Sequence, residues 1–258
     1  MEPWRAIFNG GCAAEFNMAA DAFLLEAAET GESSPIIRIY GWDRPSITIG
    51  YHQRLERAVD VTVLGDTPVV RRVTGGRALL HDDGELTYAV AGNFLRHSAL
   101  GATLQESYGA IAEAIVHFYR ALGIDVVVSR REDPFARLRP GTLQRGCFAS
   151  ISQYEIIVGG RKIAAGSQRR TQTSFMQHGV VRIAPPRRHG AIIEPDSTPD
   201  GTAIPILSGN RQALERQLSK AFSETYGVWL TSGPFLPAEA AAIETRREHF
   251  KNLNHYQL

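Results

Sequence analysis

The stretch that decides the fold is VRRVTGGRALLHDDGELTY, residues 70–88. Apolar residues at 69–70 and 78–80 predict the end of one β-strand and the start of another. The glycine pair between them permits positive φ and lets a ligand approach the backbone closely. Three arginines around the pair favour binding of a carboxylate, a phosphate or a polarised carbonyl. A Gly-Gly hairpin turn with solvated arginines is the alternative, but the density of special residues favours a binding site.

A second informative stretch, GCFASISQYEIIVGGRKIAAGSQRR, covers residues 146–170, and QHG follows at 177–179. Cys147 stands at the mouth of a glycine- and arginine-rich loop, which favours a reactive thiol over a small buried residue. The residues flanking the glycine pair at 159–160 predict a hairpin over 153–158 and 161–165. Lys162 stands one residue past that turn, and the alternative interpretation is a solvated turn lysine. We expect the two stretches to fold together into one site.

Composition places the chain among soluble globular proteins. Its 258 residues are 43% hydrophobic and 21% charged, and a net charge of +1 gives no reason to expect nucleic acid as a partner. No apolar run is long enough to span a membrane, and the first residues lack the build of a signal peptide. Two cysteines are too few for a disulfide framework, which favours the reducing cytoplasm. Nothing demands more than a monomer.

Strands and helices do not alternate regularly along the chain, which predicts an α+β fold with a mixed sheet. Helices are expected over residues 13–29, 103–122, 212–226 and 237–250, with Asn17 as a candidate cap of the first. The apolar stripe of the helix at 103–122 is interpreted as core packing. Residues 130–145 are expected to form a loop. We divide the chain into a catalytic domain at 1–230 and a C-terminal helical extension at 231–258, packed on the same domain.

A family resemblance sharpens this interpretation. RRVTGGRALLH followed by ELTYAV resembles the RRxTGGxAVxH signature of the lipoate-protein ligase and octanoyltransferase family, and FNMAADAFLLE resembles its NMAxDxxL segment. Arg77, after the glycine pair, is more similar to the cysteine-dependent octanoyltransferase branch than to the ATP-dependent ligases. The resemblance covers roughly residues 4–230. It implies a biotin/lipoate-protein-ligase-like catalytic domain with a mixed or antiparallel sheet core flanked by helices.

The resemblance also implies roles for individual residues. Cys147 would carry the acyl group, and the ammonium of Lys162 would stabilise the developing oxyanion. The family commonly reads KxxGSA after this lysine, whereas here the glycine and serine stand one place later and the spacing from Lys162 to Gln168 is kept. An apolar tunnel near Val73, Leu79 and Tyr88 would hold the chain. The residues predicted to bind substrate are Arg71, Arg72, Thr74, Gly75, Gly76, Arg77, His81, Tyr88, Gly166, Ser167, Gln168 and His178, of which both histidines are interpreted as structural.

The resemblance implies an octanoyltransferase that acts in protein lipoylation. The octanoyl group would pass from the thioester of acyl carrier protein to Cys147, and then to a lysine of a lipoyl domain. No metal and no nucleotide would be needed, because the thioester already carries the activation. The basic run at residues 187–189 is either a solvated loop or a docking site for an acidic carrier protein.

Two alternatives stay open at this point. The first is a lipoate-protein ligase that uses ATP and Mg²⁺. Arg77, the context of Cys147 and the short chain beyond residue 209 count against it. The second is an inert protein that binds an acyl carrier or a lipoyl domain, a possibility favoured by the shifted positions of Gly166 and Ser167. Retention of Cys147 and Lys162 counts against that one.

Overall fold

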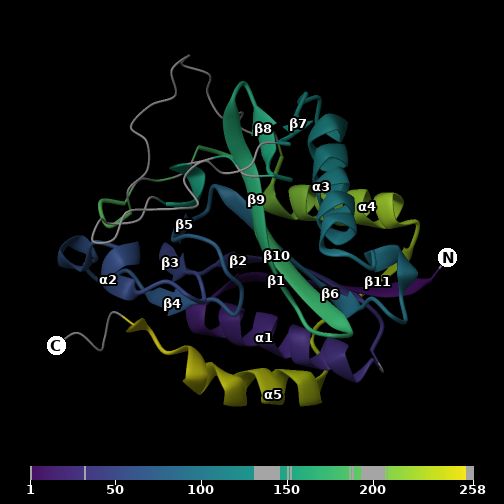
Figure 1. Cartoon of the computed structure of the whole chain (residues 1–258), viewed down its shortest axis with the longest axis horizontal. Coiled ribbons are helices and arrows are strands. Elements are labelled where there is room, and N and C mark those ends of the chain that lie inside the picture. The colour runs from purple at the N-terminus through teal and green to yellow at the C-terminus, as the bar shows by residue number, and fades with distance from the viewer. Residues whose placement is uncertain are drawn as a thin grey trace.

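An eight-stranded mixed sheet forms the centre of the fold (Figure 1). The computed structural model describes residues 2–31, 33–130, 146–149, 151, 153–185, 187, 189–192, 207 and 209–253. The strand order is β11-β1-β2-β6-β10-β9-β8-β7; β1 runs parallel to β11 and β2, and the other neighbours are antiparallel. The strands are β1 (Pro3–Cys12), β2 (Ile36–Trp42), β6 (Glu85–Asn93), β7 (Val127–Val128), β8 (Ile156–Val158), β9 (Arg161–Arg170), β10 (Ser174–Arg182) and β11 (Trp229–Ser232).

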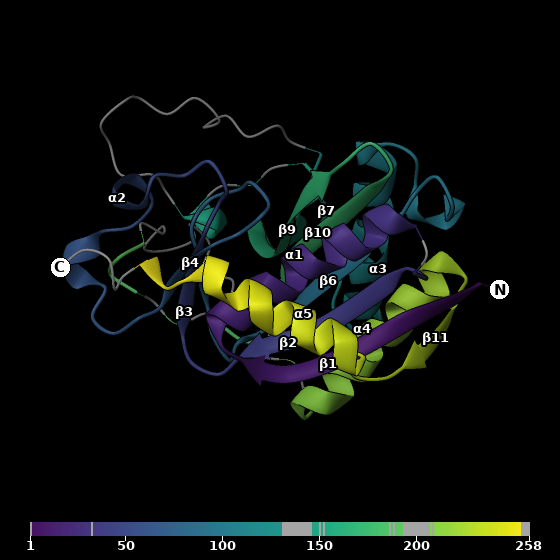
Figure 2. The same ribbon diagram turned by 90° about the horizontal axis from the view of Figure 1, so that it is seen from below.

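Four helices cover the two faces of this sheet, as Figures 1 and 2 show. Helices α3 (Leu104–Ala121) and α4 (Arg211–Tyr226) pack on one face, and α1 (Ala14–Thr30) and α5 (Pro237–Arg247) on the other. The central strand β6 is buried along its whole length, because Leu86, Tyr88 and Val90 enter the first core and Ala89 and Ala91 the second. The predicted α+β class with a mixed sheet is confirmed.

A second, three-stranded sheet contains the glycine-arginine stretch. Its order is β4-β3-β5, formed by β3 (Ser46–Ile49), β4 (Val69–Arg71) and β5 (Leu79–His81). Strands are confirmed on both sides of the glycine pair, but β4 and β5 lie on opposite sides of β3. The Gly-Gly hairpin alternative is therefore wrong. The short helices around this sheet and elsewhere are α2 (Leu55–Ala58), η1 (Val61–Val63), η2 (Ser98–Leu100), η3 (Cys147–Ala149) and η4 (Glu248–Phe250).

Helix ends follow capping chemistry, with one correction to the prediction. Thr103 caps α3 in a capping box with Glu106. Helix α1 begins at Ala14 instead, and its N-cap residue Ala13 makes no side-chain cap. The prediction that Asn17 caps this helix is wrong, because its side chain is buried and donates a hydrogen bond to the carbonyl of Gly41 at 2.9 Å. The side chain is thus used to join α1 to β2.

The C-terminal segment packs against both sheets. The carboxylate of Glu239 on α5 accepts hydrogen bonds from Arg5 of β1 at 2.6 and 2.9 Å, and Ile243 is fully buried against α1. Beyond α5, the side chain of Asn252 accepts a hydrogen bond from the backbone N–H of Val69 in β4 at 2.8 Å. The domain division between residues 230 and 231 falls inside β11 and stays a prediction.

Two further predictions concern the loop at residues 130–145 and the lack of membrane-spanning segments. Residues 131–145, most of the predicted loop at 130–145, lie outside the described residues. Among the helices that are described, none combines the length and the apolar character needed to cross a membrane.

Candidate active site

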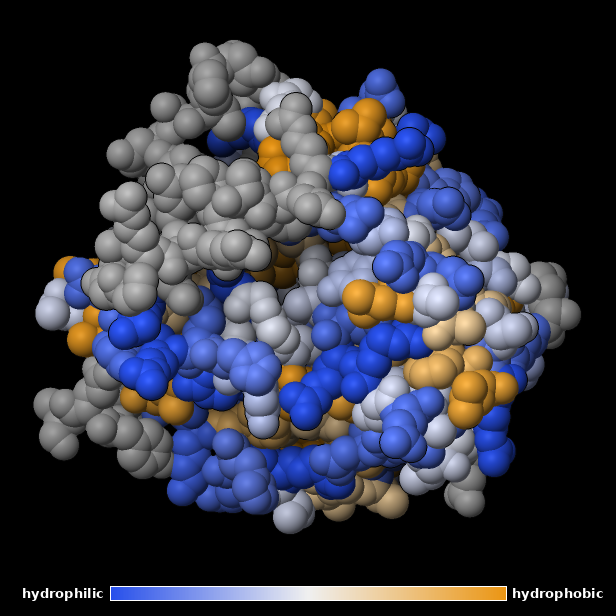
Figure 3. Space-filling model, in the orientation of Figure 1, coloured by the Kyte–Doolittle hydropathy of each residue, from blue (hydrophilic) through white to orange (hydrophobic). Residues whose placement is uncertain are grey.

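A cavity of about 590 Å³ lies where the large sheet meets the small one. Its volume falls within the range of small-molecule sites. Near the place where Figure 1 shows β5 beside β9, the space-filling view in Figure 3 is hollowed, with hydrophobic side chains at depth. The two informative stretches therefore do meet at one site. The predicted residues that line this cavity are Arg72, Gly76, Arg77, His81, Cys147, Lys162, Gly166, Ser167 and His178.

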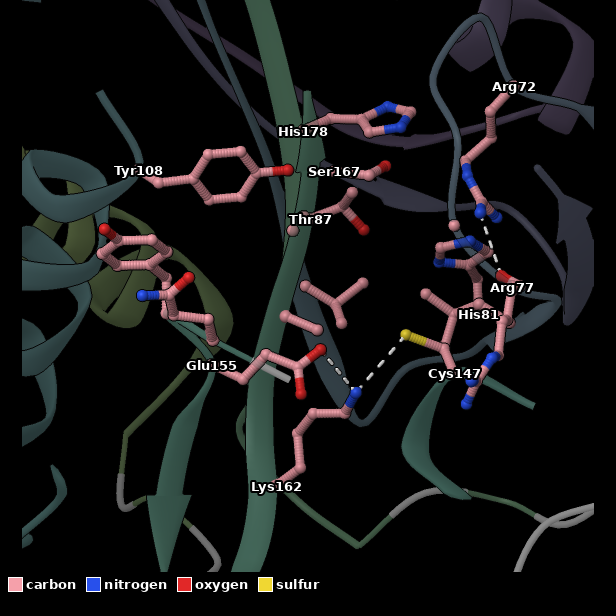
Figure 4. Close-up of a pocket in the computed structure, with 18 of the residues that line it drawn as sticks. Arg72, Arg77, His81, Thr87, Tyr108, Cys147, Glu155, Lys162, Ser167 and His178 are labelled. Carbon is pink, nitrogen blue, oxygen red and sulfur yellow. Dashed lines mark hydrogen bonds and ion pairs between the residues drawn. The ribbon is translucent and has the colours of Figure 1, made fainter. Parts of the chain in front are cut away.

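Cys147 and Lys162 point toward each other at one end of the cavity (Figure 4). The ammonium nitrogen of Lys162 lies 3.8 Å from the sulfur of Cys147 and 2.7 Å from a carboxylate oxygen of Glu155. The backbone N–H of Cys147 donates to the carbonyl of Ala78 at 2.8 Å, which fixes the cysteine beside the glycine-arginine stretch. Lys162 is only 5% exposed, so its charge acts at short range with little screening by water.

A β-bulge aims Lys162 into the cavity. In the pairing of β8 with β9, Ile156 faces Ala164 and Ile157 faces Lys162, so Ile163 is an extra residue on β9. Side chains of a regular strand alternate between faces, and Lys162 would then share a face with Gln168 rather than with Ser167. The extra residue reverses the alternation, and both Lys162 and Ser167 line the cavity.

Hydrogen bonds from Arg72 hold the glycine turn at residues 74–77. Gly76 has a φ of +92°, which glycine adopts without strain. The guanidinium of Arg72 donates to the carbonyls of Gly75 and Arg77 at 3.0 and 2.9 Å, and to the carbonyl of Thr48. Burial lowers the pKa of Arg72 to about 10, which leaves it charged at neutral pH. This arginine therefore shapes the turn as well as lining the cavity.

His81 is enclosed by polar partners and one indole ring. Its Nδ1 lies 2.6 Å from a carboxylate oxygen of Glu85, and its Nε2 lies 2.8 Å from the hydroxyl of Thr48. Trp42 stacks on the imidazole with ring centroids 3.9 Å apart. Burial lowers the pKa of His81, outweighing the opposing effect of the Glu85 carboxylate. The neutral ring therefore donates from Nδ1 to Glu85 and accepts from Thr48 at Nε2.

A chain of hydrogen bonds ends at Ser167. The carboxylate of Asp21 lies 2.7 Å from Nδ1 of His178, whose Nε2 lies 2.6 Å from the hydroxyl of Thr74. That hydroxyl lies 2.7 Å from the hydroxyl of Ser167. Burial opposes ionisation of Asp21, but hydrogen bonding and charge from His178 and Arg38 prevail, and the pKa of Asp21 is lowered. These hydrogen bonds join α1 to β10, to the glycine turn and to β9 in the cavity wall.

Five predicted substrate-binding residues do not line the cavity. They are Arg71, Thr74, Gly75, Tyr88 and Gln168. Tyr88 follows the lining residue Thr87 on β6 and points to the opposite face. A Cβ atom at Gly166 would lie 2.7 Å from the Tyr88 hydroxyl, so the two residues pack closely against each other on that face of the sheet. Of the predicted tunnel, Leu79 lines the cavity and Val73 does not. A direct role of these residues in binding stays a prediction.

The first turn of α3 lines the cavity as well. Leu104 and Tyr108 belong to the apolar stripe predicted to be core, but both contact the cavity, and Leu104 is 47% exposed. Tyr108 stacks on Tyr154, which has a φ of +63°. The core prediction holds for Ile111, Ile115 and Phe118 and is wrong for the N-terminal end of the stripe.

Sequence reasoning missed Asp21 and Glu155 as partners of the site. Asp21 is an acidic residue on the buried face of α1, where the neighbouring core-facing positions carry no charge. A fully buried carboxylate needs a partner, so its place in the helix was an available signal. Glu155 had no comparable signal, because it stands before the short strand β8 and meets Lys162 only through the bulge on the neighbouring strand β9.

The chain resembles known proteins over most of its length. A family model described as "Lipoyl protein ligase A/B catalytic domain" matches residues 13–191. Octanoyltransferase LipM of Anoxybacillus flavithermus is 40% identical over 186 residues, which cover 70% of this chain and 66% of that relative's length. Octanoyltransferase LipM of Kyrpidia tusciae is 32% identical over 261 residues, which cover 95% of this chain and 94% of that relative.

A solved structure shows the same fold. The bi-partite lipoate protein ligase of Thermoplasma acidophilum, described together with its E2 lipoyl domain, superimposes with a TM-score of 0.71. The two sequences are 19% identical, and the match covers 96% of this chain and 93% of that one.

Proposed function

Because this chain belongs to the lipoyl protein ligase A/B catalytic domain family, we propose that it is an octanoyltransferase. It moves an octanoyl group from the thioester of acyl carrier protein to Cys147, and from there to a lysine of a lipoyl domain. The observation that carries the proposal is the pair formed by Cys147 and Lys162, 3.8 Å apart in the cavity wall. The names of the relatives support the octanoyl group as the cargo.

In the first half-reaction, the thiolate of Cys147 attacks the carbonyl carbon of the incoming thioester. The bond between that carbon and the carrier's sulfur breaks, and the carrier leaves as a thiolate that takes up a proton. The ammonium of Lys162 stabilises the attacking thiolate and the oxyanion that forms on the carbonyl oxygen. Glu155 holds the ammonium in place through the 2.7 Å contact.

In the second half-reaction, the neutral ε-amine of the acceptor lysine attacks the acylated Cys147. The carbon–sulfur bond breaks, an amide forms, and the amine proton is lost to the solvent or to the departing sulfur. We propose that the lipoyl domain presents this lysine at the mouth of the cavity. The description of the Thermoplasma ligase with its E2 lipoyl domain supports an acceptor of this kind.

The donor thioester supplies the activation, so the proposal requires no ATP. Both cysteines are free thiols. A reducing compartment would keep Cys147 ready to react, and we propose that the protein works in the cytoplasm.

The test is intact-protein mass spectrometry after the protein is mixed with octanoyl-acyl carrier protein in the absence of ATP. The wild type should gain one octanoyl mass that hydroxylamine removes. Cys147→Ala should gain none, whereas Cys12→Ala, the matched control at the second cysteine, should behave as the wild type. Lys162→Met should slow adduct formation by roughly a hundredfold, the effect typical of losing one oxyanion-stabilising group.

Two outcomes would contradict the proposal. If no octanoyl adduct forms without ATP, but lipoate is transferred to a lipoyl domain once ATP and Mg²⁺ are added, the protein is a ligase. Binding of the acyl carrier without any acyl transfer in either condition would identify an inert binding protein.

A further inference from the structure

The aromatic ring of Phe148, next to Cys147, contacts two buried cations. The ammonium of Lys162 is 5.5 Å from the ring centroid of Phe148, and the guanidinium carbon of Arg182 is 4.8 Å from it. Both distances fall inside the reach of a cation–π contact. Lys162 is 5% exposed and Arg182 1% exposed, so water screens neither contact strongly.

Both cations are fixed to the large sheet. Lys162 on β9 is held by Glu155 at 2.7 Å. Arg182, at the end of β10, lies 3.2 Å from the carboxylates of both Asp82 and Glu85 and donates to the carbonyl of Leu80 at 3.3 Å. Either cation would have to break a buried ion pair in order to follow a moving ring. The two cations are therefore held in place on the large sheet, and they restrain the ring of Phe148 that contacts them.

The turn that carries Cys147 is short. It is the single 3₁₀ turn Cys147–Ala149, tied to the β5 side of the cavity by the hydrogen bond from Cys147 to Ala78. Among the described residues, this hydrogen bond restrains the Cys147 end of the turn. Phe148 supplies a second point of attachment, because its ring contacts Lys162 of β9 and Arg182 of β10.

We infer that Phe148 is a positioning residue for Cys147. Attraction between the electron-rich face of its ring and the two cations holds the sulfur of Cys147 within reach of the ammonium of Lys162. Phe148 acts through Cys147 and Lys162, and the inference rests on the proposed role of Cys147 as the nucleophile.

The test separates the electronic role of the ring from its shape. Phe148 is replaced by mono-, tri- and pentafluorinated phenylalanine, which change the size of the ring little but weaken the negative potential of its face stepwise. The background carries Cys12→Ser, so that alkylation by iodoacetamide at neutral pH reports on Cys147. The matched control is the same series at Phe94, whose ring lies 4.2 Å from the guanidinium carbon of Arg170 and does not line the cavity.

The alkylation rate at Cys147 should fall stepwise with fluorine content, by roughly fivefold at the pentafluorinated ring, as expected when a cation–π contact of ordinary strength is lost. Phe148→Tyr should retain the rate and Phe148→Leu should lose it. The Phe94 series should leave the rate unchanged. A rate that stays flat across the fluorinated rings, whether or not Phe148→Leu is slow, would overturn the inference. Because alkylation needs no acyl donor, failure of the octanoyl-adduct test would refute the proposed function separately.

Discussion

His81 carries no charge at neutral pH, although a carboxylate lies 2.6 Å from its ring. A carboxylate so close normally favours the imidazolium, but full burial removes the water that would stabilise the added charge. Burial is the larger effect here and lowers the pKa of His81. The ring is thus a neutral hydrogen-bonding link between Glu85 and Thr48.

This gives a pH prediction with a definite sign. The unfolded chain binds a proton at His81 near pH 6.5, whereas the folded protein binds it only at lower pH. Between those two values the unfolded state holds more protons, so stability rises as the pH increases, by up to about 1.4 kcal/mol per pH unit. We expect the free energy of unfolding of wild type minus that of His81→Gln, measured with urea between roughly pH 5 and 7, to rise with pH. A flat or falling difference would contradict the burial argument.

At the scale of single residues, chemistry could be predicted where residue type and neighbourhood sufficed. Cys147 and Lys162 could be named from a thiol and an amine in glycine-rich surroundings and from the family resemblance. The pairing of Asp21 with His178 could not, because the two stand 157 positions apart and meet only when α1 packs on the sheet. The placement of Arg182 beside Phe148 was hidden for the same reason.

Among the elements, the turn before β8 stores backbone strain. Tyr154 has a φ of +63°, in the left-handed region that a residue with a Cβ adopts at a cost of about 1–2 kcal/mol. Its stacking on Tyr108, with ring centroids 5.8 Å apart, and its position before Glu155 hold it there. The strain is thus located one residue from the carboxylate that fixes Lys162.

A matched pair of substitutions measures that strain. Both Tyr154→Gly and Tyr154→Ala remove the stacking, but only glycine adopts the left-handed conformation freely. We expect the glycine variant to be more stable than the alanine variant by about 1 kcal/mol in urea unfolding, the reverse of the order in ordinary strands. Tyr154→Phe, which keeps both ring and strain, is expected to match the wild type. An alanine variant equal to or more stable than the glycine one would show that the turn relaxes.

Element types were predictable from periodicity, but what they face was only partly so. The apolar stripe of α3 runs from Leu104 to Phe118 without any change of character, because a cavity for an apolar ligand and a core select the same side chains. Likewise, the strands flanking the glycine pair were evident, but their separation by β3 depends on residues 46–49, which precede them in the chain. The bulge at Ile163 breaks the alternation on which strand predictions rest.

On the scale of the whole molecule, the C-terminal segment joins parts that are distant in sequence. It leaves the large sheet after β11, contacts β1 through Glu239, covers α1 with Ile243 and reaches β4 through Asn252. These contacts make residues 231–253 part of the same core as α1. A single folding unit is the expected consequence.

Substitutions on α5 test that expectation. Ile243→Ala should reduce the free energy of unfolding by about 2–5 kcal/mol, because it leaves a cavity in the core shared with α1. Leu236→Ala, at a residue 57% exposed, is the control and should change it by less than about 0.5 kcal/mol. Both variants should unfold in one cooperative transition, followed by circular dichroism. If Ile243→Ala instead produces an early separate transition, the segment at 231–258 is an independent appendage.

The bulge at Ile163 makes the site sensitive to the length of β9. Lys162 and Ser167 share the cavity wall only because one surplus residue stands between them in the pairing with β8. The number of residues between Lys162 and Gln168 therefore matters more to the site than their identity, because the alternation along β9 and its bulge decide which side chains face the cavity. A deletion or insertion of one residue there would point the side chain of Lys162 into the core and the neighbouring core side chains into the cavity. The length of this part of β9 thus decides which face of the strand carries the lysine.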